Sequence, residues 1–192
     1  MVFASSQLTW YVARSSGIVA WALLTAGIVW GLALSTRLVR GRGASARLLD
    51  VHTFLGSLAV VFIAIHLLAL WADTFVYFGP RELFVPMAST WRPGAVAWGI
   101  VAMYLLVAVQ VTSWLRRHMP RRVWHTIHLT SIPLFVLATV HGFTAGADRS
   151  NALMQWGAFV GTLLVVWLLM LRVIAPRRTP ARRPRAEPAT AG

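Results

Sequence analysis

The sequence predicts an all-α integral membrane protein, a bundle of five transmembrane helices. Apolar residues make up 58% of the 192 residues and charged residues only 12%, whereas soluble domains average about 45–50% and 25%. The mean hydropathy is +0.67, which is more apolar character than a soluble chain of this length could bury. Apolar runs of about 20 residues, the length that crosses a hydrocarbon core, recur along the chain. This composition excludes a soluble enzyme, a disordered chain and a collagen-like fibre.

Each of the five runs is expected to be a helix, because lipid offers no partners for unpaired backbone groups. The sequence shows no alternating pattern of a transmembrane barrel. The runs cover about 16–35, 51–72, 94–115, 123–143 and 152–174.

The segments outside the runs complete the predicted organisation. The first run lacks a basic leader and a small-residue cleavage site, so we expect an uncleaved helix. Segment 73–93 contains Gly79, Pro80 and Pro86, and we expect it to lie on the outer face or dip into it. The helical domain is expected to cover 1–174, followed by a disordered Arg/Pro-rich tail, 175–192.

The arginines predict the orientation of the bundle. All 18 basic residues are Arg, and most fall in 36–50, in 116–122 and from residue 172 onward. The positive-inside rule then places the N-terminus outside and the C-terminus in the cytoplasm, as expected for a bacterial cytoplasmic (inner) membrane protein. A pI of about 12 is also typical of nucleic-acid binders, but this distribution is explained by topology, and no nucleic-acid partner is expected.

Other features fit a membrane bundle without indicating a site. The chain has no Cys, which excludes disulfides and thiolate-held iron–sulfur clusters. Five tryptophans near the predicted span ends are typical of an interfacial aromatic belt. They are Trp71, Trp91, Trp98, Trp124 and Trp156.

The histidines carry the strongest functional signal, since ionisable side chains inside a membrane are costly. The second run contains His52 and His66, and the fourth contains His125, His128 and His141. One span separates these runs, so both cross the membrane in the same direction. His52 and His128 fall at a similar depth near the cytoplasmic ends, and His66 and His141 fall together nearer the outer face.

Helix geometry makes two stacked sites plausible. Fourteen residues rise about 21 Å and fall roughly 40° short of four turns, so His52 and His66 share one helix face. Two such helices can hold two flat macrocycles, each iron taking one imidazole from each helix. His128 and His141 are thirteen residues apart, which is about 140° out of phase on a straight helix. Pro133 lies between them, and we predict a helix distortion there.

Several alternatives stay open from the residues alone. The histidines could be buried groups bonded to neighbouring backbone, in a non-redox membrane anchor, assembly subunit or transporter. A zinc or copper site is less well supported, because structural zinc takes about four ligands around one ion. His125 lies one turn before His128 and could replace it, whereas His118 is expected to be solvated or lipid-facing.

Three stretches resemble the ferric reductase-like transmembrane domain family. They are Trp10-Tyr-Val-Ala-Arg14-Ser-Ser-Gly17, then His52-x-x-x-Gly56 followed by His66, and Arg121-Arg-x-Trp124-x-x-x-His128 followed by His141 and Gly146-x-Asp148. That family includes the membrane domains of ferric reductases and NADPH oxidases. It also includes the haem-binding membrane subunit of the periplasmic methionine sulfoxide reductase system.

The resemblance implies two b-type haems that relay electrons across the membrane. An inner haem would use His52 and His128 as axial ligands, and an outer haem His66 and His141. Unlike ferric reductases, the chain shows only a short tail where a flavin- and NAD(P)H-binding portion would follow. We therefore expect an oxidoreductase component, and whether it is an enzyme by itself stays open.

The expected partners are those of a two-haem electron carrier. Electrons would come from a separate cytoplasmic-side flavoprotein or from quinol, and would leave to an extracytoplasmic acceptor. A quinone or a partner-bound flavin would then be a further cofactor. Arg14, Arg117 and Arg121 are candidate contacts for haem propionates, since Arg suits carboxylate recognition. Gly56, one turn from His52, is a candidate for close approach of a porphyrin.

Overall fold

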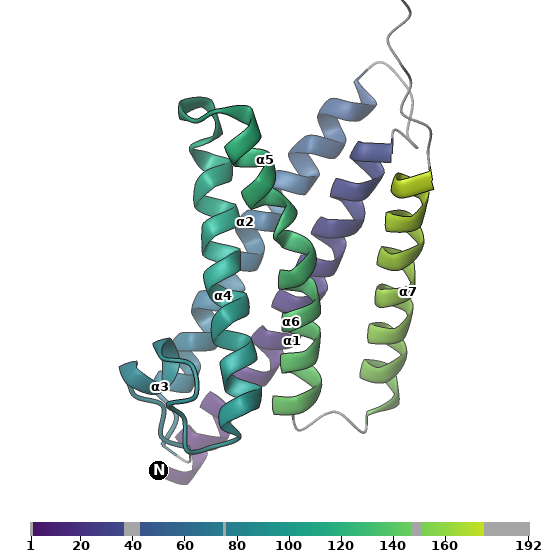
Figure 1. The fold of residues 1–192 in the computed structure, drawn as a ribbon. Helices are drawn as coiled ribbons and strands as arrows, with labels where there is room; N and C mark the ends of the chain where they lie inside the picture. Colours follow the sequence, from purple (N-terminus) through teal and green to yellow (C-terminus); the bar gives the residue numbers. More distant parts are fainter. Residues whose placement is uncertain (1, 37–42, 75, 147–150, 175–192) are drawn as a thin grey trace, which may run out of the picture.

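The computed structural model is all-helical over the residues it describes, which are 2–36, 43–74, 76–146 and 151–174. The helices are α1 (Val2–Thr36), α2 (Ala44–Trp71), α3 (Pro80–Phe84), α4 (Pro93–Trp114), α5 (Arg121–Leu129), α6 (Ser131–Ala145) and α7 (Ala152–Ile174), with a short 3-10 turn at Arg116–His118 (Figure 1). Five spans are long and apolar enough to cross a membrane, α5 and α6 together forming the fourth. The predicted five-helix architecture is confirmed. The tail 175–192 lies outside the described residues.

Four spans close into a ring. Helix α1 packs against α2, α2 against α4, α4 against α6, and α6 against α1, while α7 packs on the outside against α1 (Figure 1). This order puts α2 and α6 at opposite corners, with α1 and α4 between them. Side chains from α2 and from α5–α6 can therefore meet across the centre of the ring.

The fourth span is broken where the distortion was predicted. Helix α5 ends at Leu129 and α6 begins at Ser131, with Thr130 as the joint. Pro133 explains the break, because its ring nitrogen has no hydrogen to donate to the carbonyl one turn earlier. The turn tightens instead, and the Thr130 N–H donates to Ile127 O at 3.0 Å.

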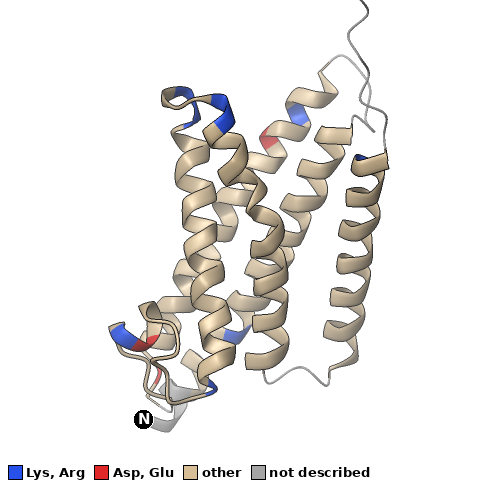
Figure 2. Cartoon of the chain, in the orientation of Figure 1, with Lys and Arg blue, Asp and Glu red and all other residues tan. Residues whose placement is uncertain are grey.

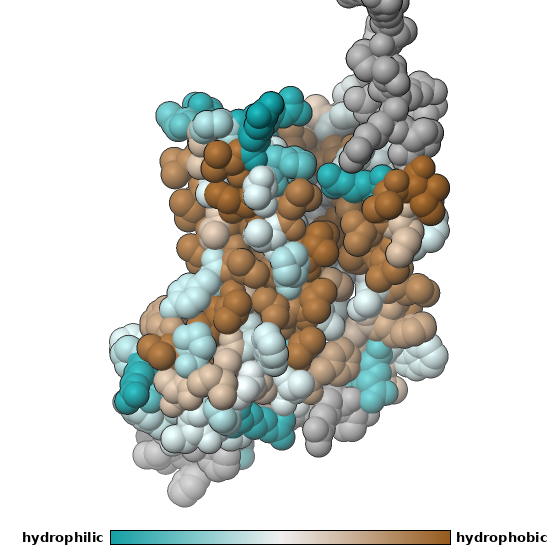
Figure 3. Space-filling model, in the orientation of Figure 1, coloured by the Kyte–Doolittle hydropathy of each residue, from teal (hydrophilic) through white to brown (hydrophobic). Residues whose placement is uncertain are grey.

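Charges are confined to the two ends of the bundle (Figure 2). We call one end the basic end, because it holds Arg47, Arg116, Arg117, Arg121, Arg122 and Arg172. The other is the α3 end, where α1 begins. Between them the surface is mostly apolar (Figure 3), with many large hydrophobic side chains exposed on α7. Such a surface is suited to contact with lipid.

The segment after α2 packs onto the α3 end of the bundle. Its Phe78 and Leu83 are buried together with Val96 and Ile100 of α4. Asp73 is buried, where it accepts a hydrogen bond from Thr9 of α1 at 3.1 Å. The segment therefore covers the bundle end instead of spanning it, and its location on the outer face stays a prediction.

Candidate functional site

Four histidines face each other as two pairs across the ring. The imidazole centroids of His52 and His128 are 5.9 Å apart, with 71° between the ring planes. Those of His66 and His141 are 6.5 Å apart, with an angle of 82°. The break at Thr130 thus brings His128 and His141 onto the side of their span that faces α2, despite their thirteen-residue spacing. The first pair lies nearer the basic end and the second nearer the α3 end.

Three of the four rings are oriented by a backbone carbonyl. The Nδ1 atom of His52 lies 2.9 Å from Gly27 O, that of His66 lies 2.7 Å from Ala13 O, and that of His141 lies 2.8 Å from Ala95 O. A carbonyl can only accept, so each Nδ1 carries the hydrogen and donates it. The lone pair on Nε2 is then left for a metal, which is the usual arrangement of metal-ligating histidine.

A glycine lies against each of these three rings. A Cβ built on Gly31 would lie 3.1 Å from His52, one on Gly17 would lie 3.1 Å from His66, and one on Gly99 would lie 2.6 Å from His141. These separations are tighter than ordinary contacts, and the last is too short for any real side chain. The rings therefore occupy space that only glycine leaves open.

The same local arrangement recurs three times. In each case the accepting carbonyl belongs to the residue four positions before the glycine, which is one helical turn. We call this a carbonyl–glycine notch, made by Ala13 with Gly17, Gly27 with Gly31, and Ala95 with Gly99. Helix α1 supplies two notches to α2, and α4 supplies one to α6. The histidines of α2 and α6 are thus each oriented by a neighbouring helix of the ring.

His128 is held differently. Its Nδ1 lies 3.4 Å from the Ser113 hydroxyl of α4, a long contact. The Trp124 indole stacks on its ring, with centroids 5.0 Å apart and 25° between planes. Arg172 of α7 and His125 both act on it electrostatically. The pair nearer the basic end is therefore asymmetric, with one notch-held ring and one stacked ring.

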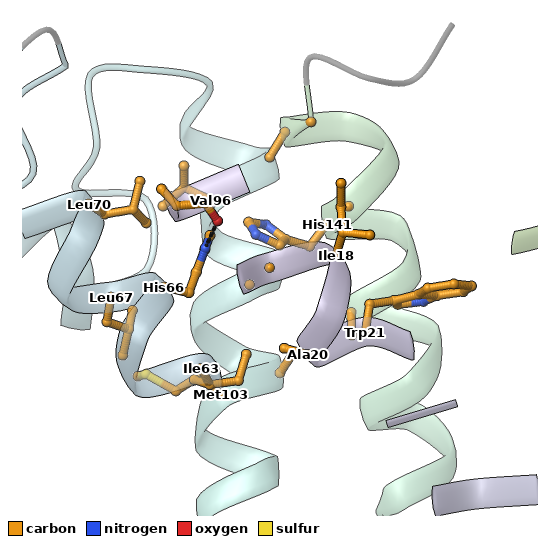
Figure 4. Close-up of a pocket in the computed structure, with 18 of the residues that line it drawn as sticks. Ile18, Ala20, Trp21, Ile63, His66, Leu67, Leu70, Val96, Met103 and His141 are labelled. Atoms are coloured by element: carbon orange, nitrogen blue, oxygen red, sulfur yellow. Dashed lines mark hydrogen bonds between the residues drawn. The ribbon is translucent and has the colours of Figure 1, made fainter. Parts of the chain in front are cut away.

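The second pair lines a largely apolar cavity of about 210 Å³. His66 and His141 point into it from opposite sides, with the His66 hydrogen bond drawn as a dashed line (Figure 4). Its lining is mainly apolar, and Arg14 and Glu82 supply the charged side chains at its wall. Arg14 lies at the wall of this cavity, and its contact with a haem propionate stays a prediction.

The other residues singled out in the sequence have the following positions in the structure. Arg117 and Arg121 are exposed at the basic end, and their propionate contacts stay a prediction. Gly56 faces Gln110, since a Cβ there would lie 3.0 Å from its amide oxygen. Two of the predicted belt tryptophans also make ring contacts within the bundle. Trp91 packs edge-on against Trp10 and Phe78, and Trp124 packs on His128.

The glycines and carbonyls that orient the histidines were not predicted from the sequence, although the glycine spacing could have indicated them. Gly17 and Gly31 are fourteen residues apart, the same spacing as His52 and His66. Two antiparallel helices with equal spacings can bring both pairs of residues into register. Arg172 was used only to predict the membrane orientation of the bundle. Its electrostatic effect on His128 depends on how α7 packs.

The geometry fits an iron held by two imidazoles. With metal–nitrogen bonds of about 2 Å, two axial imidazoles have centroids about 6.3 Å apart, and the two observed separations lie on either side of that value. Among the residues that the structure describes, no three His, Asp or Glu side chains cluster as a bare metal ion would require. Two ligands at each level suit a macrocycle that supplies the other four.

Comparison with known families identifies the family of this chain. Residues 16–139, which include three of the four paired histidines, match the family model described as ferric reductase like transmembrane component. Neither a curated protein nor a solved structure matches the chain.

Proposed function

Because the chain belongs to the ferric reductase-like transmembrane component family, whose members are haem-containing membrane electron-transfer components, we propose that it binds two b-type haems and conducts electrons between them. His52 and His128 would ligate the haem nearer the basic end, here called the inner haem. His66 and His141 would ligate the outer haem. The facing of two histidine pairs on two co-directional spans is the observation that carries this proposal.

When bound, each haem supplies an iron that takes up and releases one electron. Residues of the chain orient the imidazoles and set the polarity around the haem. The notches fix the tautomer and rotation of three imidazoles, so that little reorganisation is needed when the charge changes. The apolar lining of the outer cavity excludes water and lowers the local dielectric, which influences the reduction potential.

The charge distribution supports a direction for the flow. The basic end carries most of the described arginines, so the positive-inside rule makes it cytoplasmic and places α3 outside. Electrons would then enter at the inner haem from a separate flavoprotein or from membrane quinol. They would leave at the outer haem to an extracytoplasmic acceptor, with the chain acting as one subunit of an oxidoreductase system in a bacterial inner membrane.

The first test is haem stoichiometry together with optical and EPR spectra of the purified protein. We expect two b-type haems per chain and sharp visible bands on reduction. The imidazole planes cross at 71° and 82°. If the rings kept these steep angles when holding a haem iron, the ferric protein would be expected to give highly anisotropic low-spin EPR signals. A folded protein without haem, expressed with haem available, would instead favour buried structural histidines in a non-redox subunit.

Arg14 offers a separate test of the outer site. We expect Arg14→Gln to lower the outer haem potential by roughly 50 mV, since the positive charge at the cavity wall stabilises the more negative, reduced state. Redox titration of the two centres measures the shift. Arg81→Gln, on α3 and exposed, is the matched control and should leave both potentials unchanged. Equal shifts in the two variants would argue against a local role for Arg14.

A further inference from the structure

Trp124 has a buried donor without an acceptor. Its indole Nε1 is shielded from solvent and has no hydrogen-bond partner in the part of the chain that the structure describes. A buried N–H without a partner is costly, and most such groups in folded proteins are satisfied. The indole ring lies on His128 and meets the His125 ring edge-on at 6.4 Å. The unsatisfied donor therefore lies at the inner histidine pair.

His128 is also the ring without a carbonyl–glycine notch. Its hydroxyl neighbour, Ser113, is 3.4 Å away, so the stacked indole is the most extensive restraint on its rotation. Residues four apart on a helix lie on the same face, which explains how Trp124 reaches His128 within the short α5. An unsatisfied N–H donor beside a ligand suits an anionic group, and a carboxylate is a strong acceptor for it.

We infer that Trp124 is a positioning residue of the inner site, which holds His128 through its ring face and donates its indole N–H to a carboxylate of the haem bound there. This inference rests on the proposed function, because it requires a haem between His52 and His128. The outer pair needs no such residue, since both of its rings are notch-held. The inner and outer histidine pairs are therefore oriented by different kinds of contact.

Two substitutions separate the two roles of the indole. Trp124→Phe keeps a stacking ring and removes the donor, whereas Trp124→Leu removes both. The haem-loaded protein in detergent is mixed with excess apomyoglobin, and the rate of haem transfer is followed optically. EPR spectra taken during the transfer identify which centre empties. Trp114→Phe is the control, because Trp114 lies at the same end of the bundle on α4 and is largely exposed.

We expect Trp124→Phe to release the inner haem about tenfold faster or more, as the loss of a hydrogen bond to a charged group implies. Trp124→Leu should release it faster still and alter the inner low-spin EPR signal, because His128 is then free to rotate. In both variants the outer haem should be retained at the wild-type rate, which also reports that the bundle is folded.

Two results would overturn the inference. One is a Trp124→Phe variant that keeps the inner haem as well as wild type and Trp114→Phe do. The other is faster release from both centres alike, which would show a general loosening of the bundle. Neither result touches the proposed function, which fails separately if His128→Ala still binds two haems or if the wild-type protein binds none.

Discussion

Replacing His141 by alanine is expected to reduce the haem content from two per chain to one. A haem iron held between His66 and His141 would lose one of its two protein ligands, and within the part of the chain described here no other histidine is paired with His66. The cavity between them is largely apolar, so no side chain of similar strength is at hand to replace the imidazole. The inner pair is on the other side of the Thr130 joint and should keep its haem. Haem per chain and the reduced-minus-oxidised spectrum measure the result.

The matched substitutions make this result specific. His66→Ala should remove the same centre, and His52→Ala or His128→Ala the other. His118→Ala should change neither, because His118 is exposed in the turn before α5. His125→Ala should leave the haem content unchanged, in contrast to His128→Ala, since the ring facing His52 is that of His128. Retention of two haems in His141→Ala would contradict the four-histidine assignment.

Gly99→Ala is expected to be strongly damaging to the outer site. Its Cβ would lie 2.6 Å from the His141 ring, while the Ala95 carbonyl holds that ring in place. The ring must leave its notch or the two helices must separate, and overpacking of this kind costs about 1–3 kcal/mol. We expect most of the outer haem to be lost and the melting temperature to fall. Gly17→Ala, with its closest approach at 3.1 Å, should give the same effect in milder form.

The control for Gly99→Ala is the same substitution where there is room. Gly157 lies in the interior of α7, is exposed, and has nothing within 4 Å of an added Cβ. It does not line the cavity between His66 and His141. At such helical positions alanine is favoured over glycine by roughly 0.5–1 kcal/mol. Gly157→Ala should therefore be neutral or slightly stabilising and keep both haems. If Gly99→Ala behaves like Gly157→Ala, the notch does not position His141.

The sequence predicts the fold well because a membrane imposes simple rules. Run length and apolar content identify the five spans, and Pro133 identifies the break in the fourth. The facing histidines also follow from sequence, since spacing along a helix translates directly into height and angle. The predicted boundaries differ from the observed helices mainly at α1, which begins at Val2 instead of near residue 16.

The supporting parts of the site could not be predicted in the same way. Which carbonyl faces a histidine depends on how two helices are rotated against each other, and apolar surfaces that contact lipid leave that rotation undetermined in the sequence. Trp124 has the position of an interfacial belt residue, and only packing shows that its ring covers His128. The electrostatic effect of Arg172 on His128 likewise depends on how α7 packs against α1.

The paired notches of α1 limit how this chain can change its length over evolution. Gly31 meets His52 and Gly17 meets His66, so the stretches 17–31 and 52–66 run alongside each other as strictly matched lengths. One residue inserted into either stretch would turn the helix beyond it by about 100° and detach one level from its support. A related chain that gains or loses a residue in one stretch should show a compensating change in the other. The connecting segments at both ends of the bundle are free of that requirement, and length variation among relatives should accumulate there.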